Sequence, residues 1–237
     1  MAINNNPKIV TDGLIFHVDS ADKNCYGGSG ASVSDLSPSE LTSTFTNPSY
    51  SGSINKGSFH YDGVDKYITV PSSAITNLQN NLSFEVWFNK QGVGSVGSAF
   101  DGIFKKVGGY SGYPVYGIVA STEANPTNLV MQFSYSGDLN DGATATIKST
   151  GITIGEWVCC SVTVSSDRVA KGYYQGELQT TLTLTADLKD ENNTCQIGMV
   201  DGRRFNGYIP IVKIYNRELS ASEVRQNFNA MKSRFGL

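Results

Sequence analysis

The feature that most constrains this chain is the alternation of side chains over residues 82–88, which places Trp87 with Ser83 and Glu85 on the second face. Every second residue of this segment is apolar: Leu82, Phe84, Val86 and Phe88. Successive side chains of a β-strand point to opposite faces of the sheet, whereas a helix would scatter this pattern around its surface. The segment therefore predicts a strand with one apolar face, and such a face needs a second layer to cover it.

Short segments of similar character follow one another along most of the chain, each bounded by turn-forming residues. They cover residues 14–18, 58–61, 67–70, 102–107, 115–119, 129–135, 144–147, 156–164, 169–174, 179–184, 194–198 and 205–215. The Asp62-Gly63 pair predicts a hairpin-like turn between two of them, and residues 20–57 are expected to form a long ordered loop. About ten to twelve strands at this spacing indicate a sandwich of two antiparallel sheets. We expect one domain over residues 1–237, with short N- and C-terminal tails.

One helix is predicted near the end of the chain, over about residues 221–231. Ser220 is followed three residues later by Glu223, the pattern of a capping box. Val224, Phe228 and Met231 then recur at helical spacing. We therefore expect a single amphipathic helix that lays its apolar stripe on the sandwich.

The charge balance excludes several classes of partner. The chain has 18 Lys and Arg against 21 Asp and Glu, a formal net charge of -3, and its cations are scattered, so we expect no binding to nucleic acid. No apolar run is long enough to span a bilayer and the opening residues do not resemble a signal peptide, so we expect no membrane partner and synthesis in a cytoplasm. The four cysteines, Cys25, Cys159, Cys160 and Cys195, are expected to remain thiols.

Eight blocks of the sequence carry a family resemblance in the family's order. They are residues 13–19, 35–37, 57–67, 84–88, 155–157, 174–178, 205–209 and 214–224. Together they resemble the laminin-G-like jelly-roll family within the concanavalin A-like lectin and glucanase superfamily, which implies an all-β jelly-roll. The opening residues 7–13 and the closing residues 226–237 are similar to those of phage-encoded members that are virion structural proteins.

Two departures from the family pattern concern a metal site. Family members commonly have Asp where this chain has Pro210, and many relatives have a second Asp where this chain has Lys66, beside Asp62 and Asp65. The resemblance implies a structural calcium near such carboxylates, but proline offers no charged oxygen and lysine adds a cation. We therefore expect no metal and no other cofactor.

The carboxylates do not predict an enzyme. Hydrolysis of a glycosidic bond needs two carboxyl groups that face one sugar linkage, whereas Glu85 is the only carboxylate on its strand. We interpret Glu85, Asp187, Asp190 and Glu191 as solvated charges. The two histidines, His17 and His60, are expected to be sheet residues at an edge or on a partly exposed face.

Three tyrosines in a glycine-rich segment are the candidate residues for binding a glycan or a protein partner. Tyr110, Tyr113 and Tyr116 would offer flat apolar area with a polar tip. The alternative is that they fold back over the edge of the sandwich.

The resemblance favours a structural component of a bacteriophage virion, such as a capsid decoration, neck, tail or fibre protein, made in the host cytoplasm and held by other virion proteins. Phe235 and Leu237 near the end of the chain are the candidate assembly contacts. The alternative for these two residues is that they cover their own sandwich. The alternative function is a carbohydrate-binding, lectin-like domain that attaches to a host-surface glycan, and a glycan-cleaving enzyme ranks last.

Overall fold

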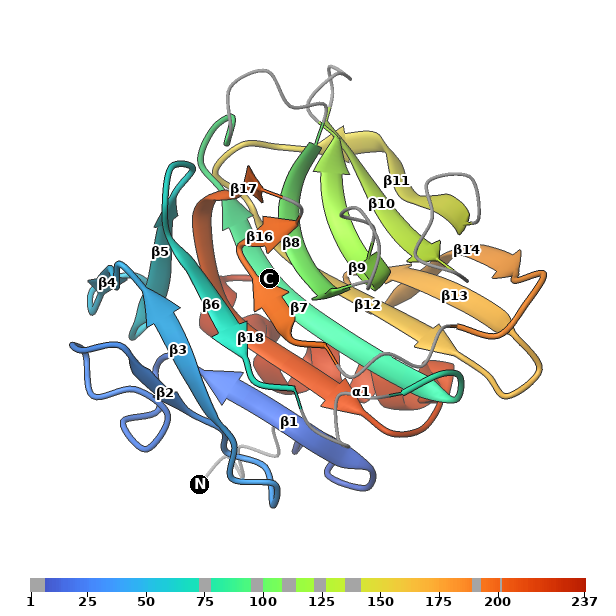
Figure 1. The fold of residues 1–237 in the computed structure, drawn as a ribbon, viewed down its shortest axis with the longest axis horizontal. Helices are drawn as coiled ribbons and strands as arrows, with labels where there is room; N and C mark the ends of the chain where they lie inside the picture. The colour runs from blue at the N-terminus through green and yellow to red at the C-terminus, as the bar shows by residue number, and fades with distance from the viewer. Residues whose placement is uncertain are drawn as a thin grey trace, which may run out of the picture.

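The computed structural model describes residues 7–72, 78–94, 100–107, 114–121, 127–134, 142–188, 193–200 and 202–237. Within these residues the chain forms two antiparallel sheets of eight strands each, which confirms the predicted sandwich (Figure 1). Sheet A runs in the order β14 (Glu177–Thr183), β13 (Val169–Tyr174), β12 (Trp157–Val164), β7 (Leu82–Lys90), β18 (Asn206–Tyr215), β5 (Ser58–Asp62) and β4 (Tyr50–Ser51), and β1 (Leu14–Asp19) also pairs with β18.

Sheet B packs against sheet A. It runs in the order β11 (Gly142–Ile152), β10 (Thr127–Ser134), β9 (Pro114–Ser121), β8 (Phe100–Val107), β15 (Cys195–Ile197), β6 (Tyr67–Val70), β3 (Thr42–Thr46) and β2 (Ser32–Ser34). A small hairpin of β16 (Met199–Val200) and β17 (Arg203–Arg204) lies beside β8.

The core lies between the two sheets and is made by the alternation seen in the sequence. The apolar face of β7 points into it, and Phe84 stacks on Tyr116 of β9 with ring centroids 5.4 Å apart. Phe104 of β8 lies 5.3 Å from the same phenylalanine ring. Burying large rings between the sheets is the main stabilising contribution in a fold of this kind.

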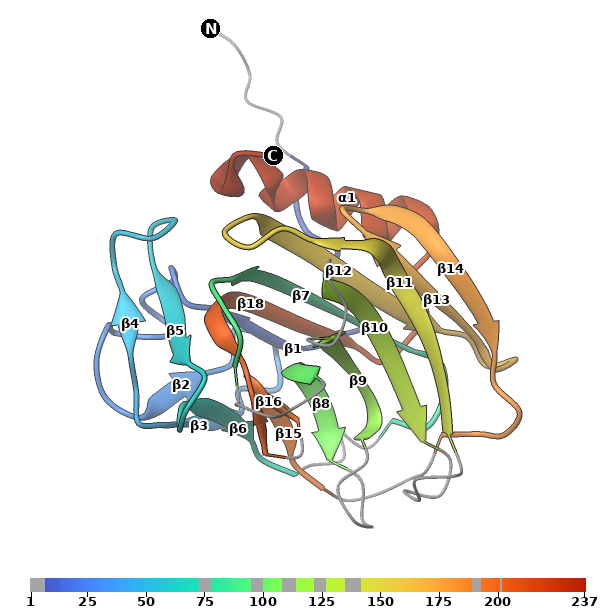
Figure 2. The ribbon, with the colours of Figure 1, turned by 90° about the horizontal axis from the view of Figure 1, so that it is seen from above.

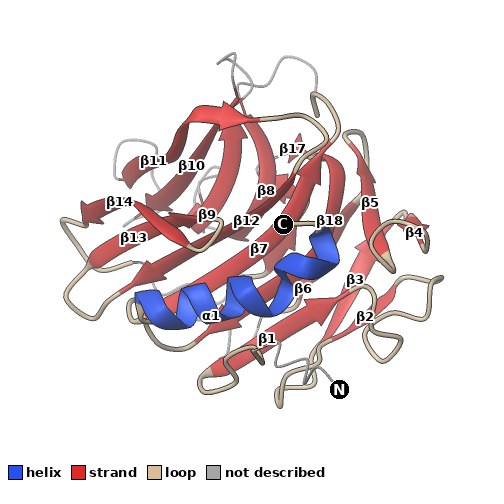
Figure 3. Cartoon of the chain, turned by 180° about the vertical axis from the view of Figure 1, so that it is seen from behind, coloured by secondary structure: helices blue, strands red, loops and turns tan. Residues whose placement is uncertain are grey.

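A helical layer covers part of the outer face of sheet A. Helix α1 (Ala221–Met231) begins at Ser220, which forms the predicted capping box with Glu223, and it continues into a 3-10 helix over Lys232–Phe235. Arg217 holds the capping carboxylate in an ion pair of 2.6 Å. Figure 2 shows the three layers in the order helix, sheet A and sheet B, and Figure 3 shows that the strands of sheet A continue past the helix.

The segment around Asp62 and Gly63 differs from the sequence prediction. The two flanking strands do not pair with each other, because β5 belongs to sheet A and β6 belongs to sheet B. The turn has the expected positive φ, 79° at Gly63, but it carries the chain from one sheet to the other. The prediction of a hairpin-like unit was therefore wrong.

Residues 20–57 contain more regular structure than expected. Strands β2, β3 and β4 form within this segment, where the sequence predicted an ordered loop. Tyr26 and Phe45 are buried in the main core and anchor it, and their rings lie 6.4 Å apart. These strands are only 3, 5 and 2 residues long, so each gives a weak signal in the sequence.

The fold confirms one prediction about residue chemistry. All four cysteines are free and buried, as expected. No helix in the described part of the chain is long and apolar enough to cross a membrane.

Candidate functional site

The tyrosines proposed as a binding surface do not form one in the described part of the chain. Tyr116 is fully buried in the core, where it stacks on Phe84 and lies beside Cys195. A buried ring cannot contact a glycan or a protein at the surface, so the prediction was wrong for Tyr116. Tyr110 and Tyr113 lie outside the described residues.

Phe235 is not available as an assembly contact. Its ring is 6% exposed and stacks on Trp87 of β7 with a centroid separation of 4.4 Å and an interplanar angle of 20°. The tail therefore covers its own sandwich, and the prediction was wrong for Phe235. Leu237 is 47% exposed, and its role in assembly stays a prediction.

Glu85 is buried under helix α1 and is not a solvated charge. Its carboxylate accepts a hydrogen bond of 3.0 Å from the Trp87 indole and pairs with Lys213 at 2.6 Å. Glu85 is 1% exposed and Lys213 is fully buried, so the carboxylate cannot reach a sugar at the surface. Asp187 is exposed as expected, whereas Asp190 and Glu191 lie outside the described residues.

The residues at the family's calcium position do not fit a calcium ion. The ammonium of Lys66 lies 2.6 Å from a carboxylate oxygen of Asp62 and 3.3 Å from one of Asp65. A lysine in this position supplies the positive charge that the carboxylates would otherwise share with a metal. The hydrogen bond from Lys66 and bonds from the backbone lower the pKa of Asp62 to about 2, although burial opposes the shift. Over the described ranges, no cluster of three or more His, Cys, Asp and Glu side chains could hold a metal.

The strongest candidate site is a row of side chains on the outer face of sheet A. Four neighbouring strands bring Trp157 of β12, Asn89 of β7, Tyr208 of β18 and His60 of β5 into direct register. Residues that face each other across a ladder point to the same side of the sheet. We name these four residues the aromatic row. Trp157, Tyr208 and His60 are partly exposed, whereas Asn89 is buried between them.

The rings of the aromatic row are close enough to act together. The Trp157 and Tyr208 centroids are 6.5 Å apart with an interplanar angle of 37°, and the Tyr208 and His60 centroids are 5.2 Å apart with an angle of 41°. Among the described residues, neither the Trp157 indole N–H nor the Tyr208 hydroxyl makes a hydrogen bond. Flat apolar rings with unused polar groups suit a ligand that is itself apolar on one face and hydroxylated at its edges.

Hydrogen bonds fix the two polar members of the row. The Asn89 amide donates to the Gly155 carbonyl at 2.6 Å and accepts from Gln91. His60 Nδ1 lies 3.2 Å from the Ser49 hydroxyl. Partial burial lowers the pKa of His60, and Lys66 adds to this effect while Asp62 opposes it. The lowered pKa favours the neutral form of the ring.

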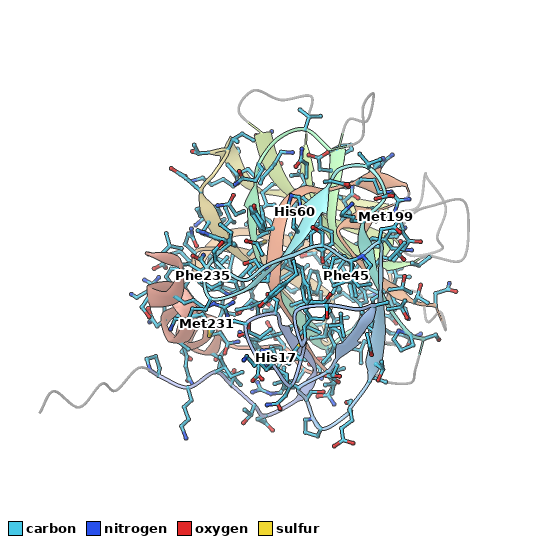
Figure 4. All side chains as sticks on the ribbon, turned by 90° about the vertical axis from the view of Figure 1, so that its left-hand side faces the viewer. His17, Phe45, His60, Met199, Met231 and Phe235 are labelled. Carbon is cyan, nitrogen blue, oxygen red and sulfur yellow. The ribbon has the colours of Figure 1, made fainter. Side chains whose placement is uncertain are left out.

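The C-terminal tail borders the row on one side. The Trp157 ring lies 4.8 Å from the ring of Phe235. Arg234 lies over Phe235 and donates to the carboxylate of Asp19 at 2.7 Å. Figure 4 shows Phe235 on the helical layer, His60 on β5, and Met199 on the opposite side of the sandwich from Phe235.

The loop after β7 begins next to Asn89 of the row, to which Gln91 donates a hydrogen bond. Lys90 is buried and pairs with Asp101, and it also donates to the Gly92 carbonyl at 2.5 Å. The second oxygen of Asp101 accepts from the Gly94 N–H at 3.0 Å, and Asn206 donates to the Val93 carbonyl at 3.0 Å. This network holds the loop in place beside the row, and burial lowers the pKa of Lys90 to about 8.

Sequence reasoning did not find the aromatic row. It placed His60 correctly in a strand with a partly exposed side chain, and His17 likewise. Trp157 and Tyr208 belong to two of the sequence blocks that carry the family resemblance. No feature of the sequence indicated that the two residues lie close together. The only local indication was that β12, β18 and β5 each carry an aromatic residue at a position that faces away from the core. Such residues indicate a common site only when the register between the strands is known.

Comparison with known proteins gives one family match. Residues 62–225 match the model of the concanavalin A-like lectin/glucanases superfamily, in its laminin G form. No curated protein sequence matches the chain.

Solved structures of similar fold include sugar-binding domains. Domain 4 of AbnA, an extracellular GH43 arabinanase from Geobacillus stearothermophilus, was solved with arabinotriose and is 17% identical, with a TM-score of 0.66 over 92% of this chain and 99% of that domain. The binding domain of botulinum neurotoxin serotype G is 17% identical, with a TM-score of 0.69 over 91% of this chain and 50% of that one. The binding domain of botulinum neurotoxin DC, solved with SialylT, is 16% identical, with a TM-score of 0.70 over 93% and 52%.

At these identities the likeness shows the fold alone. The chain spans about half the length of the toxin binding domains that it matches, but almost the whole of the arabinanase domain.

Proposed function

Because the chain belongs to the concanavalin A-like lectin/glucanase superfamily, we propose that it is a carbohydrate-binding domain that holds a glycan on the aromatic row. The proposal concerns binding and includes no cleavage of the glycan. The proposal favours the lectin-like alternative over the virion structural role.

The observation that carries the proposal is the alignment of three partly exposed rings across four strands. Trp157, Tyr208 and His60 belong to separate strands but lie on one face in one register. Rigid strands hold such rings with only a small loss of side-chain entropy on binding, because tryptophan and tyrosine have few rotatable bonds. The unused hydroxyl of Tyr208 and indole N–H of Trp157 can hydrogen-bond to sugar hydroxyls at the edges of the rings.

The arabinanase domain gives more support to the proposal than the toxins do. Its whole length matches this chain, and it was solved with an oligosaccharide. The toxin domains extend well beyond the half that matches this chain. A ligand bound by the whole toxin domain can therefore lie outside the matching half.

The absence of catalysis stays a prediction. It is supported by the burial of Glu85, the one carboxylate on the clearest strand, in an ion pair with Lys213. A catalytic carboxyl group must reach the glycosidic oxygen or the anomeric carbon, and this side chain does not reach the surface.

The virion role also stays a prediction. It rests on the resemblance of the two ends of the sequence to phage-encoded proteins. A carbohydrate-binding surface is compatible with it, since a virion component can attach to a host-surface glycan. A map of intact particles that places the chain, and shows whether the aromatic row faces outward, would test both ideas together.

The test of the proposed function removes one ring at a time. We expect Trp157→Ala and Tyr208→Ala each to weaken glycan binding about five- to tenfold, because a stacked ring contributes on the order of 1 kcal/mol. Binding would be measured by glycan array and then by titration calorimetry with the best ligand, and circular dichroism melts would confirm folding.

The matched control is Leu178→Ala. Leu178 is 50% exposed on the edge strand β14 and does not belong to the row. Equal binding by the parent and both ring variants would refute the proposal, as would no signal from the parent protein on the array.

A further inference from the structure

We propose that the aromatic row selects a single, soluble, neutral polysaccharide chain and contacts several successive sugars of it. The inference rests on the proposed function and adds the class of ligand to it. It distinguishes such a chain from a terminal sugar, from an acidic polysaccharide and from the flat face of a crystalline polysaccharide.

The length of the row favours an internal stretch of a chain. Trp157, Asn89, Tyr208 and His60 occupy four adjacent strands, so the row extends over three inter-strand spacings. With neighbouring strands about 4.8 Å apart, the row is about 14 Å long at the backbone. The ring centroids are 6.5 Å and 5.2 Å apart, so the end rings lie at most about 12 Å from each other. One sugar ring covers one aromatic ring of this set, so the full row contacts more than one sugar. Recognition of a terminal sugar needs side chains that surround one ring, and here the rings follow one another across strands β12, β18 and β5.

The tilt of the rings favours a twisted chain over a flat surface. The two consecutive pairs are tilted by 37° and 41°. Adjacent strands of a sheet rotate relative to one another by about 20–25°, and side chains that rise from them share this twist. A crystalline face presents parallel, coplanar sugars, and rings tilted in this way cannot all stack on it. A single chain in solution can rotate about its glycosidic bonds and follow them.

The charges around the row favour a neutral ligand. Arg234 is the guanidinium that borders the row next to Phe235, and it donates both to Asp19 and to the carbonyls of Asn55 and Gly57. Lys66 is held by Asp62 and Asp65. Two cations that could attract a sugar carboxylate are thus already paired, and binding an acidic sugar would require breaking those pairs.

The class of ligand can be tested with a panel of defined probes. Soluble linear arabinan and laminarin are the neutral chains, polygalacturonate is the acidic chain, and microcrystalline cellulose and crystalline chitin are the flat surfaces. Affinity electrophoresis covers the soluble probes and depletion assays cover the insoluble ones. We expect retardation by at least one neutral chain and no measurable binding to the acidic chain or to the crystals.

A length series then tests whether the rings act as a row. With oligosaccharides of one to six sugars from the bound chain, we expect Kd to fall at least tenfold between the monosaccharide and the trisaccharide or a longer member. His60 lies at one end of the row, so His60→Ala should weaken binding of the longer oligosaccharides about threefold or more and leave the shortest ones unchanged. His60→Phe, which keeps a flat ring, should restore the length dependence.

The outcomes separate this inference from the proposed function. Binding that depends on Trp157 but is as strong for a monosaccharide, for polygalacturonate or for crystalline cellulose would overturn the inference and leave the proposed function standing. A uniform effect of His60→Ala at every length would also overturn the inference. No binding of any probe would overturn both.

Discussion

The buried ion pair of Glu85 and Lys213 is the clearest case of a residue whose role depends on its partner. Both side chains are almost completely buried, and the second carboxylate oxygen of Glu85 has no hydrogen-bond partner among the described residues. Removing one member of a buried pair leaves an uncompensated charge. We therefore expect Lys213→Met to lower the free energy of unfolding by about 3–5 kcal/mol in urea denaturation. The double variant with Glu85→Gln should recover a large part of this loss, because the amide is neutral and still accepts from Trp87.

An exposed ion pair provides the control for this prediction. Lys171 and Glu218 lie 2.8 Å apart, but their side chains are 34% and 28% exposed. Lys171→Met should change the free energy of unfolding by less than about 1 kcal/mol. If Lys213→Met and Lys171→Met lowered the free energy of unfolding by similar amounts, burial of the Glu85–Lys213 pair would not explain the effect of Lys213→Met.

At the scale of the element, the C-terminal helical segment acts as a cover for sheet A. Phe228 and Phe235 both stack on Trp87, with centroid separations of 5.7 and 4.4 Å. Deleting residues 233–237 removes the ring of Phe235 and the ion pair of Arg234 with Asp19. We expect the loss of a buried phenylalanine to cost about 3 kcal/mol. In a chain of this length, that loss lowers Tm by about 6–12 °C, which differential scanning calorimetry would measure.

Leu237→Ala is the matched control within the same tail. Leu237 is 47% exposed, and its replacement should leave Tm within about 2 °C of the parent value. A truncated protein that melts like the parent would contradict the covering role of Phe235 and would revive the idea that this residue contacts a neighbouring subunit.

At the scale of the whole molecule, the four thiols report on global unfolding. Cys25, Cys159, Cys160 and Cys195 are all buried, and burial raises the pKa of Cys25 and of Cys195 to about 12. The thiolate is the reactive form, so these groups are unreactive while the protein is folded. We expect a chromogenic disulfide reagent to detect almost no thiol in the native protein and all four in concentrated guanidinium chloride. Fast reaction of any cysteine in the native protein, with the circular dichroism spectrum unchanged, would contradict this expectation.

The sequence alone determined the features that depend on neighbouring residues. Alternation with a period of two predicted strand β7 and the sandwich, and the capping box of Ser220 and Glu223 predicted helix α1 with its bounds. Both signals are local, because side-chain direction along a strand and hydrogen bonding at a helix start involve residues only a few positions apart.

Only the tertiary structure decided which faces are covered and which residues meet. The sequence left open whether Tyr116 and Phe235 are exposed, and it indicated a solvated charge at Glu85. All three are buried, because Tyr116 packs on the opposite sheet, Phe235 packs on Trp87 of sheet A, and Glu85 pairs with buried Lys213. Trp157 and His60 are almost a hundred positions apart and meet in one row only through the register of four strands. Register and layer packing are set by the whole core rather than by local preference, so no local pattern could have predicted the aromatic row.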